Sequence, residues 1–193
     1  MTATSVLALQ SQTENTKSQG TDAEWKTDKC HMRCRPTART PEDRKELFRN
    51  SRVVLREGKL YVQLSEYHGQ PLHPFSGYYL PYPESNFDGL VSTISDDPPQ
   101  LNWIYLHIET LQFSHGLRAE AEKGLTGSWG ARVCSDGEKR FLFDNWEGFI
   151  AVEEEQGLWS LCFDKNDDGL SGRVDEGQRT VEVELIREEM EGS

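Results

Sequence analysis

The stretch RVVLREGKLYVQLSE, residues 52–66, predicts two β-strands joined by a tight turn. Two apolar runs flank Glu57-Gly58, a dipeptide that suits the short turn of a hairpin. In the second run the apolar residues Leu60, Val62 and Leu64 alternate with their neighbours, so they would share one face of a strand. This period of two, rather than the 3.6 of a helix, sets the expected fold class.

Similar patterns recur along the rest of the chain. Strand-like segments follow at 90–95, 101–109, 112–118, 128–135, 139–144, 146–154, 157–164 and 179–188. Asp136-Gly137 and the turn at 155–157 predict two further hairpins. We therefore expect an all-β fold, a single sandwich or barrel of about nine or ten antiparallel strands. No internal sequence repeat is evident.

The first forty residues differ from the rest. Residues 1–40 are rich in Thr, Ser, Gln and Lys and lack periodicity, so we expect a disordered tail there and a single β-rich domain over 41–193. Thr40 as a cap and Pro41 at the first helical position predict one short helix at 41–48.

Three segments, 79–106 (YLPYPESNFDGLVSTISDDPPQLNWIYL), 144–154 (DNWEGFIAVEE) and 157–172 (GLWSLCFDKNDDGLSG), carry a resemblance. They resemble small uncharacterised proteins of filamentous fungi, some of them encoded beside genes for specialised metabolism. The resemblance implies a metabolic context. It brings no catalytic residues.

The charge distribution narrows the choice of partners. The chain has a net charge of -12, yet residues 1–50 hold nine Lys/Arg against seven Asp/Glu, so the acidic excess belongs to the predicted domain. Such a surface repels phosphate backbones, which argues against nucleic acid as a partner. No apolar run is long enough to span a membrane. The N-terminus lacks the basic region of a secretory signal, so we expect a cytoplasmic or nuclear protein that is not secreted.

The segment DKNDDGLSGRVD, residues 164–175, has the spacing of a calcium-binding loop. The expected ligands are Asp164, Asn166, Asp168, Asp175 and the carbonyl of Leu170. Strands on both sides exclude an ordinary helix-loop-helix unit. The alternative is a solvated connection kept polar by Asp and turned by Gly, without a cofactor.

A second candidate site lies in the proline-rich stretch 67–89, which we expect to form one long loop. Its rings could form an apolar surface for a small molecule or a protein partner: Tyr67, Phe75, Tyr78, Tyr79 and Tyr82. The alternative is that the loop covers an open end of the sheet and buries its own rings.

Other groups carry weaker signals. Cys30, His31 and Cys34 lack the second ligand pair of a zinc site, so we expect free thiols whose pKa the basic neighbours lower. His107 and Glu109, two residues apart on a predicted strand, would form an acid–base pair if they faced a barrel interior.

Three functions follow from these residues. The first is a non-catalytic β-domain that binds a small molecule or a protein, for which the resemblance implies an accessory role in fungal specialised metabolism. The second is a lipocalin-like barrel enzyme, an isomerase or cyclase acting on an apolar metabolite. The third is a calcium-binding module at 164–175. Whether the chain is an enzyme is left open.

Overall fold

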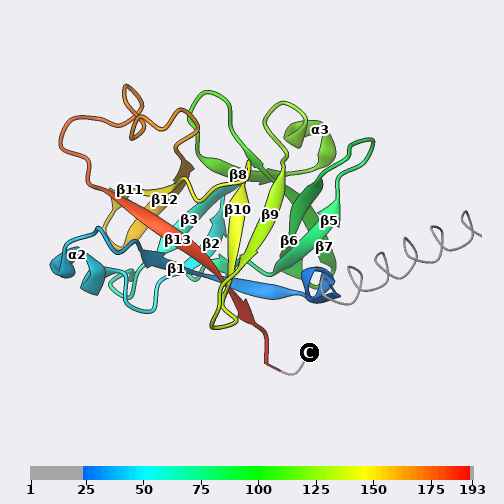
Figure 1. Cartoon of the computed structure of the whole chain (residues 1–193), viewed down its shortest axis with the longest axis horizontal. Coiled ribbons are helices and arrows are strands. Elements are labelled where there is room, and N and C mark those ends of the chain that lie inside the picture. Colours follow the sequence, from blue (N-terminus) through cyan, green and yellow to red (C-terminus); the bar gives the residue numbers. More distant parts are fainter. Residues whose placement is uncertain (1–23, 192–193) are drawn as a thin grey trace, which may run out of the picture.

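A computed structural model describes residues 24–191, and strands are the main regular structure in that part of the chain (Figure 1). The strands are β1 (Cys30–Pro36), β2 (Arg52–Arg56), β3 (Lys59–Gln63), β4 (His73–Pro74), β5 (Gly77–Pro81), β6 (Asp88–Asp96), β7 (Pro99–Leu106), β8 (Phe113–Gly116), β9 (Trp129–Val133), β10 (Lys139–Phe143), β11 (Phe149–Glu155), β12 (Leu158–Phe163) and β13 (Thr180–Glu189). The described helices are the 3-10 helix η1 (Glu24–Thr27), α2 (Glu42–Leu47) and α3 (Arg118–Ala121). None of them has the length and hydropathy to cross a membrane.

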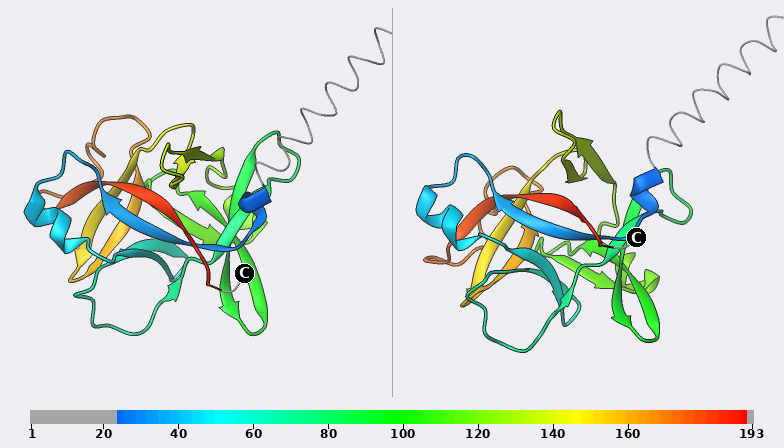
Figure 2. Two further views of the ribbon diagram at one scale, coloured as in Figure 1. Left: turned by 60° about the horizontal axis from the view of Figure 1, so that its bottom comes forward. Right: turned by 90° about the horizontal axis from the view of Figure 1, so that it is seen from below.

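The strands close on themselves. Every strand pair is antiparallel, and the pairings return to β1 through a ring of nine strands, β1-β5-β6-β7-β8-β3-β12-β11-β13. Figure 2 shows the closing contact, where β1 runs beside β13. The expectation of an all-β, barrel-like fold is therefore confirmed.

The pairing follows a threefold scheme. Strands β1–β5, β6–β9 and β10–β13 form three consecutive units, with β4 and β5 together counting as one strand. In each unit the middle strands form a hairpin: β2–β3, β7–β8 and β11–β12. The three hairpins meet because β3 pairs with both β8 and β12. The units join through the pairs β5–β6, β9–β10 and β13–β1. The order of strand pairing is therefore repeated three times, although no repeat is evident in the sequence.

The hairpins form where the sequence predicted them. Glu57 and Gly58 have φ angles of 49° and 79°, which is the left-handed backbone that a two-residue hairpin turn requires. Gly157 has a φ of 76°, and a Cβ there would lie 2.5 Å from the backbone nitrogen of Tyr67. Glycine is therefore needed at 157 both for the turn and for the close approach of the chain.

Aromatic rings from several strands pack against one another in the core. Phe113, which is fully buried, contacts the rings of Trp129, Phe143, Phe149 and Phe163 with centroid distances of 5.1 to 6.0 Å. These rings come from five different strands. Burial of such large side chains is the main source of stability in a fold with so little helix.

The assignment of residues 30–36 to a disordered tail is wrong. This segment forms β1, and Cys30, Met32 and Cys34 are buried while the residues between them point outward. The inward positions hold two cysteines and one methionine, so the alternation lacks the branched residues that usually mark a strand. Residues 1–23 lie outside the described part.

The assignment of 67–89 to one loop also needs correction. Strands β4 and β5 lie inside it, and β5 pairs with β6 over five residues. Pro74 and Pro81 stand at strand ends, where a missing N–H costs no ladder bond. The short helix at 41–48 is confirmed as α2, although Pro41 and not Thr40 occupies the N-cap position.

Truncation of Met32 to alanine tests the inclusion of β1 in the fold. We expect Met32→Ala to lower the free energy of unfolding by about 2–5 kcal/mol, because the buried side chain leaves a cavity. Urea denaturation measures the change. The neighbouring exposed variant Arg33→Ala should change stability by at most about 0.5 kcal/mol. Equal stabilities of Met32→Ala and the native chain would contradict the burial of this strand.

Candidate functional site

A pocket of about 600 Å³ lies between the outer face of β1 and the segment formed by α2 and the residues after it. Its walls hold five cationic side chains: Arg33, Arg35, Lys45, Arg49 and Arg140. Glu184 is the only carboxylate that lines it, and Phe48, Ala38 and Pro36 supply apolar surface. The volume is within the range of small-molecule sites.

Local structure explains how these side chains reach the pocket. The inward position of Cys34 in β1 turns Arg33 and Arg35 outward. Phe48 follows α2 and is buried edge-to-face against Trp159 with ring centroids 5.1 Å apart. This contact pins the helix to the barrel and keeps Lys45 and Arg49 beside β1.

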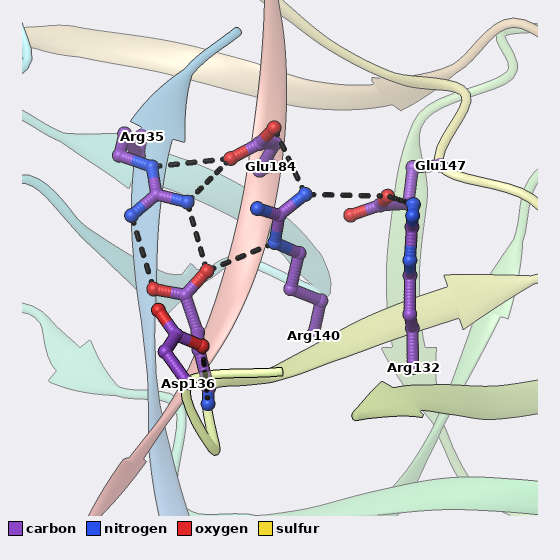
Figure 3. Close-up of polar contacts among 7 residues, drawn as sticks. Arg35, Arg132, Asp136, Arg140, Glu147 and Glu184 are labelled. Atoms are coloured by element: carbon purple, nitrogen blue, oxygen red, sulfur yellow. Dashed lines mark hydrogen bonds and ion pairs between the residues drawn. The ribbon is translucent and has the colours of Figure 1, made fainter. Parts of the chain in front are cut away.

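A closed ring of alternating charges lies beside the pocket and contributes Arg35, Arg140 and Glu184 to its wall (Figure 3). Arg35 donates to Glu138 at 2.8 and 3.0 Å and to Glu184 at 2.7 and 3.1 Å. Arg140 bridges the same two carboxylates, with bonds of 2.9 Å to Glu138 and 3.1 Å to Glu184. Each of these four side chains is therefore held by two partners of opposite charge.

The ring extends over the outer face of the barrel and is electrically balanced. Glu147 lies 3.6 Å from Arg140 and accepts a hydrogen bond from Arg132 at 3.2 Å. Hydrogen bonds from Arg35 and Arg140 lower the pKa of Glu138 to about 2. Its carboxylate therefore stays ionised at neutral pH, and the ring acts as a rigid wall that shows no net charge to a ligand.

The remaining cations of the pocket are held more loosely. Lys45 and Arg49 pair with Glu42 and Glu46, one turn earlier on the same exposed segment, and Arg33 lies 3.6 Å from Glu188. Ion pairs of this exposed kind contribute little free energy, so a ligand can replace the partner at small cost. These three cations give the pocket its positive character.

The five rings predicted as a ligand surface do not come together. Phe75 and Tyr79 are buried in the core, where both contact Phe141. Tyr82 is buried against Phe87 and Trp103. Tyr78 is half-buried in β5, and Tyr67 lines a separate pocket of about 440 Å³. Three of the five rings are thus buried, which favours the alternative interpretation for them.

Asp164 organises the acidic loop. Its buried carboxylate accepts backbone N–H bonds from Asp168, Gly169 and Leu170 at 3.0, 2.9 and 3.4 Å. The Leu170 side chain is buried in the core. The other expected ligands are all exposed: Asn166, Asp168 and Asp175. Within residues 24–191, no three His, Cys, Asp or Glu side chains are arranged to hold a metal ion.

The thiols of Cys30 and Cys34 are free, but the expectation that their pKa is lowered is wrong. Burial raises the pKa of Cys30 to about 11 and that of Cys162 to about 12, and it raises the pKa of Cys34 further. The earlier expectation, a pKa lowered by basic neighbours, assumed that Cys30 and Cys34 were solvent-exposed. His107 and Glu109 lie beyond the end of β7 in a turn and do not face the barrel interior.

Arg33 and Arg35 were missed as pocket residues from sequence because residues 30–36 were assigned to a tail. The available signal was the alternation of Cys30, Met32 and Cys34 with His31, Arg33 and Arg35. Read as a strand, this segment presents a basic face. The positive charge of that face is opposite in sign to the net charge of the whole chain, which is -12.

The charge ring predicts that the domain loses stability at acidic pH. The pKa of Glu138 is lowered from 4.5 to about 2 in the folded state, so its stabilisation is complete above pH 4.5 and disappears as the pH falls toward 2. We expect the free energy of unfolding to fall over this window, and to fall less in Glu138→Gln. Urea denaturation at a series of pH values measures both curves. Glu57→Gln, in an exposed turn, serves as the control, and a Glu138→Gln curve parallel to the native one would contradict the role of the ring.

Calcium binding by residues 164–175 stays a prediction, which calorimetry checks directly. Heat at millimolar calcium that disappears in Asp168→Ala would support the site. Asp164→Ala is unsuitable as the test, because loss of its three backbone bonds also loosens the loop. Absence of heat from the native chain would leave the loop with a structural role alone.

The protein family that matches the chain is consistent with strand pairing in three four-stranded units. The model of the fungal beta-trefoil domain matches residues 4–191. No curated protein and no solved structure matches the chain. Because the match covers nearly the whole sequence, the chain belongs to the fungal beta-trefoil domain family.

Proposed function

We propose that this domain is a non-catalytic binding module whose ligand is a small molecule bearing a carboxylate or phosphate group. The ligand would occupy the pocket between α2 and β1. The observation that carries the proposal is a pocket in which three cations, Arg33, Lys45 and Arg49, are held by exposed ion pairs, on a chain of net charge -12. Arginine and lysine in these numbers are the groups that recognise carboxylate and phosphate.

The titration behaviour of nearby groups supports binding rather than catalysis. A general acid or base works best with a pKa near the working pH. The pKa of Cys34 is instead raised by burial, and that of Glu138 is lowered by its arginines. Both groups keep one protonation state at neutral pH, which suits a preorganised wall better than a proton carrier.

The alternative of a lipocalin-like enzyme draws less support. That hypothesis needs an enclosed cavity lined by His107 or Glu109. The interior is packed with rings around Phe113, and His107 and Glu109 lie in a surface turn. An accessory role in fungal specialised metabolism rests on the sequence resemblance alone, and an acidic metabolite as ligand would be compatible with it.

Binding of inorganic phosphate and citrate tests the proposal. We expect amide NMR shifts from both anions to concentrate in β1 and in residues 42–51, and to shrink as salt screens the cations. The double variant Lys45→Ala/Arg49→Ala should weaken binding about tenfold, because two cations leave the pocket.

The matched control is Lys123→Ala/Lys165→Ala, which removes two exposed lysines outside the pocket. It should bind both anions as the native chain does. Shifts spread evenly over the surface, or equal weakening in both double variants, would contradict a specific anion site.

A further inference from the structure

We propose that the basic pocket continues past Asn50 into the pocket that Tyr67 lines, so that the ligand is an elongated organic acid with an apolar, ring-bearing end. This inference rests on the proposed function and adds the second half of the ligand. The acidic group would lie beside α2, and the apolar group would lie against Tyr67.

The two pockets are neighbours on the surface. Asn50 lines both of them, so it forms the boundary between them. Arg33 in the first pocket and Arg52 in the second are cross-strand partners in the β1–β2 pairing. Figure 2 shows α2 and the loop that follows β3 at the same end of the molecule. The two pockets are therefore close enough for one elongated ligand to reach both.

The side chain of Tyr67 is fixed in position by its contacts within the protein. Its hydroxyl donates a hydrogen bond to the carbonyl of Gln70 at 3.1 Å, and its ring lies so close to Gly69 that a Cβ there would be 2.3 Å from the hydroxyl oxygen. Tyr67 also packs with Leu72 against a small apolar cluster of Val54, Tyr61 and Leu158. A ring fixed before binding loses little entropy when it contacts a ligand.

The two halves of the groove differ in chemistry. Five cations line the first half, whereas the second is lined by one cation, Arg52, together with the ring of Tyr67 and the apolar side chains Leu64, Pro71, Leu72 and Pro74. A ligand made only of anionic groups would leave this apolar surface unmatched. A neutral apolar ligand would leave the cations unmatched. Charge and polarity are both matched by a small molecule with an acidic group at one end and an apolar ring system at the other.

Three probes separate the contributions of the two halves: inorganic phosphate, 2-naphthyl phosphate and 2-naphthol. We expect 2-naphthyl phosphate to bind at least about tenfold more tightly than inorganic phosphate, because burial of the ring system adds apolar contact. 2-Naphthol should bind more weakly than 2-naphthyl phosphate, because it lacks the anion. Calorimetry measures all three affinities.

Variants of the second pocket then show whether the tighter binding of 2-naphthyl phosphate arises there. Leu72→Asp and Tyr67→Ser should each remove the advantage of 2-naphthyl phosphate and leave the affinity for inorganic phosphate unchanged. Leu72→Asp keeps the aromatic ring, so it provides a second test if Tyr67→Ser folds poorly. Ile108→Ser is the control, since it removes an exposed apolar side chain from a different pocket.

The outcomes distinguish the two proposals. Equal affinities for the two phosphates, or an advantage that survives both Tyr67→Ser and Leu72→Asp, would overturn the elongated ligand and leave the anion site standing. Binding of neither phosphate, or binding of both that Lys45→Ala/Arg49→Ala does not weaken, would overturn the anion site and the extended groove together.

Discussion

Strand β1 pairs with β13 along its whole length, from Cys30 opposite Glu189 to Pro36 opposite Val183, and this ladder closes the barrel. The same strand positions the candidate site. Its inward residues fill the core, and its outward arginines reach the pocket and the charge ring. The stability of the domain and the geometry of its site therefore depend on one set of backbone hydrogen bonds.

Much of the fold follows from local sequence patterns. The hairpins β2–β3, β9–β10 and β11–β12 were predicted because alternating apolar residues flank glycine turns, and α2 because Thr40 and Pro41 mark its start. Strands β1 and β5 were missed for a physical reason. The inward positions of these strands hold Cys, Met, Tyr and Gly rather than branched aliphatic residues, and a proline stands at the end of each strand. The closure of the barrel and the threefold scheme have no local signal at all.

The candidate site could be predicted less well than the fold. Arg35 meets Glu138 and Glu184 across sequence separations of 103 and 149 residues, so no short motif records their contact. For the predicted aromatic surface, composition shows that rings are present but cannot show which face of a strand they occupy. Phe75 and Tyr79 turn inward, while Tyr67, from the loop before them, stays at the surface.

The ladder between β1 and β13 also bears on how the chain is made. A ribosome releases β1 long before β13 exists, and all the intervening strands must emerge in the meantime. Until then the edges of β1 and its neighbours lack their final partners, and exposed strand edges recruit other chains. Synthesis of this domain thus passes through a stage in which protection of the nascent chain matters more than the stability of the finished barrel.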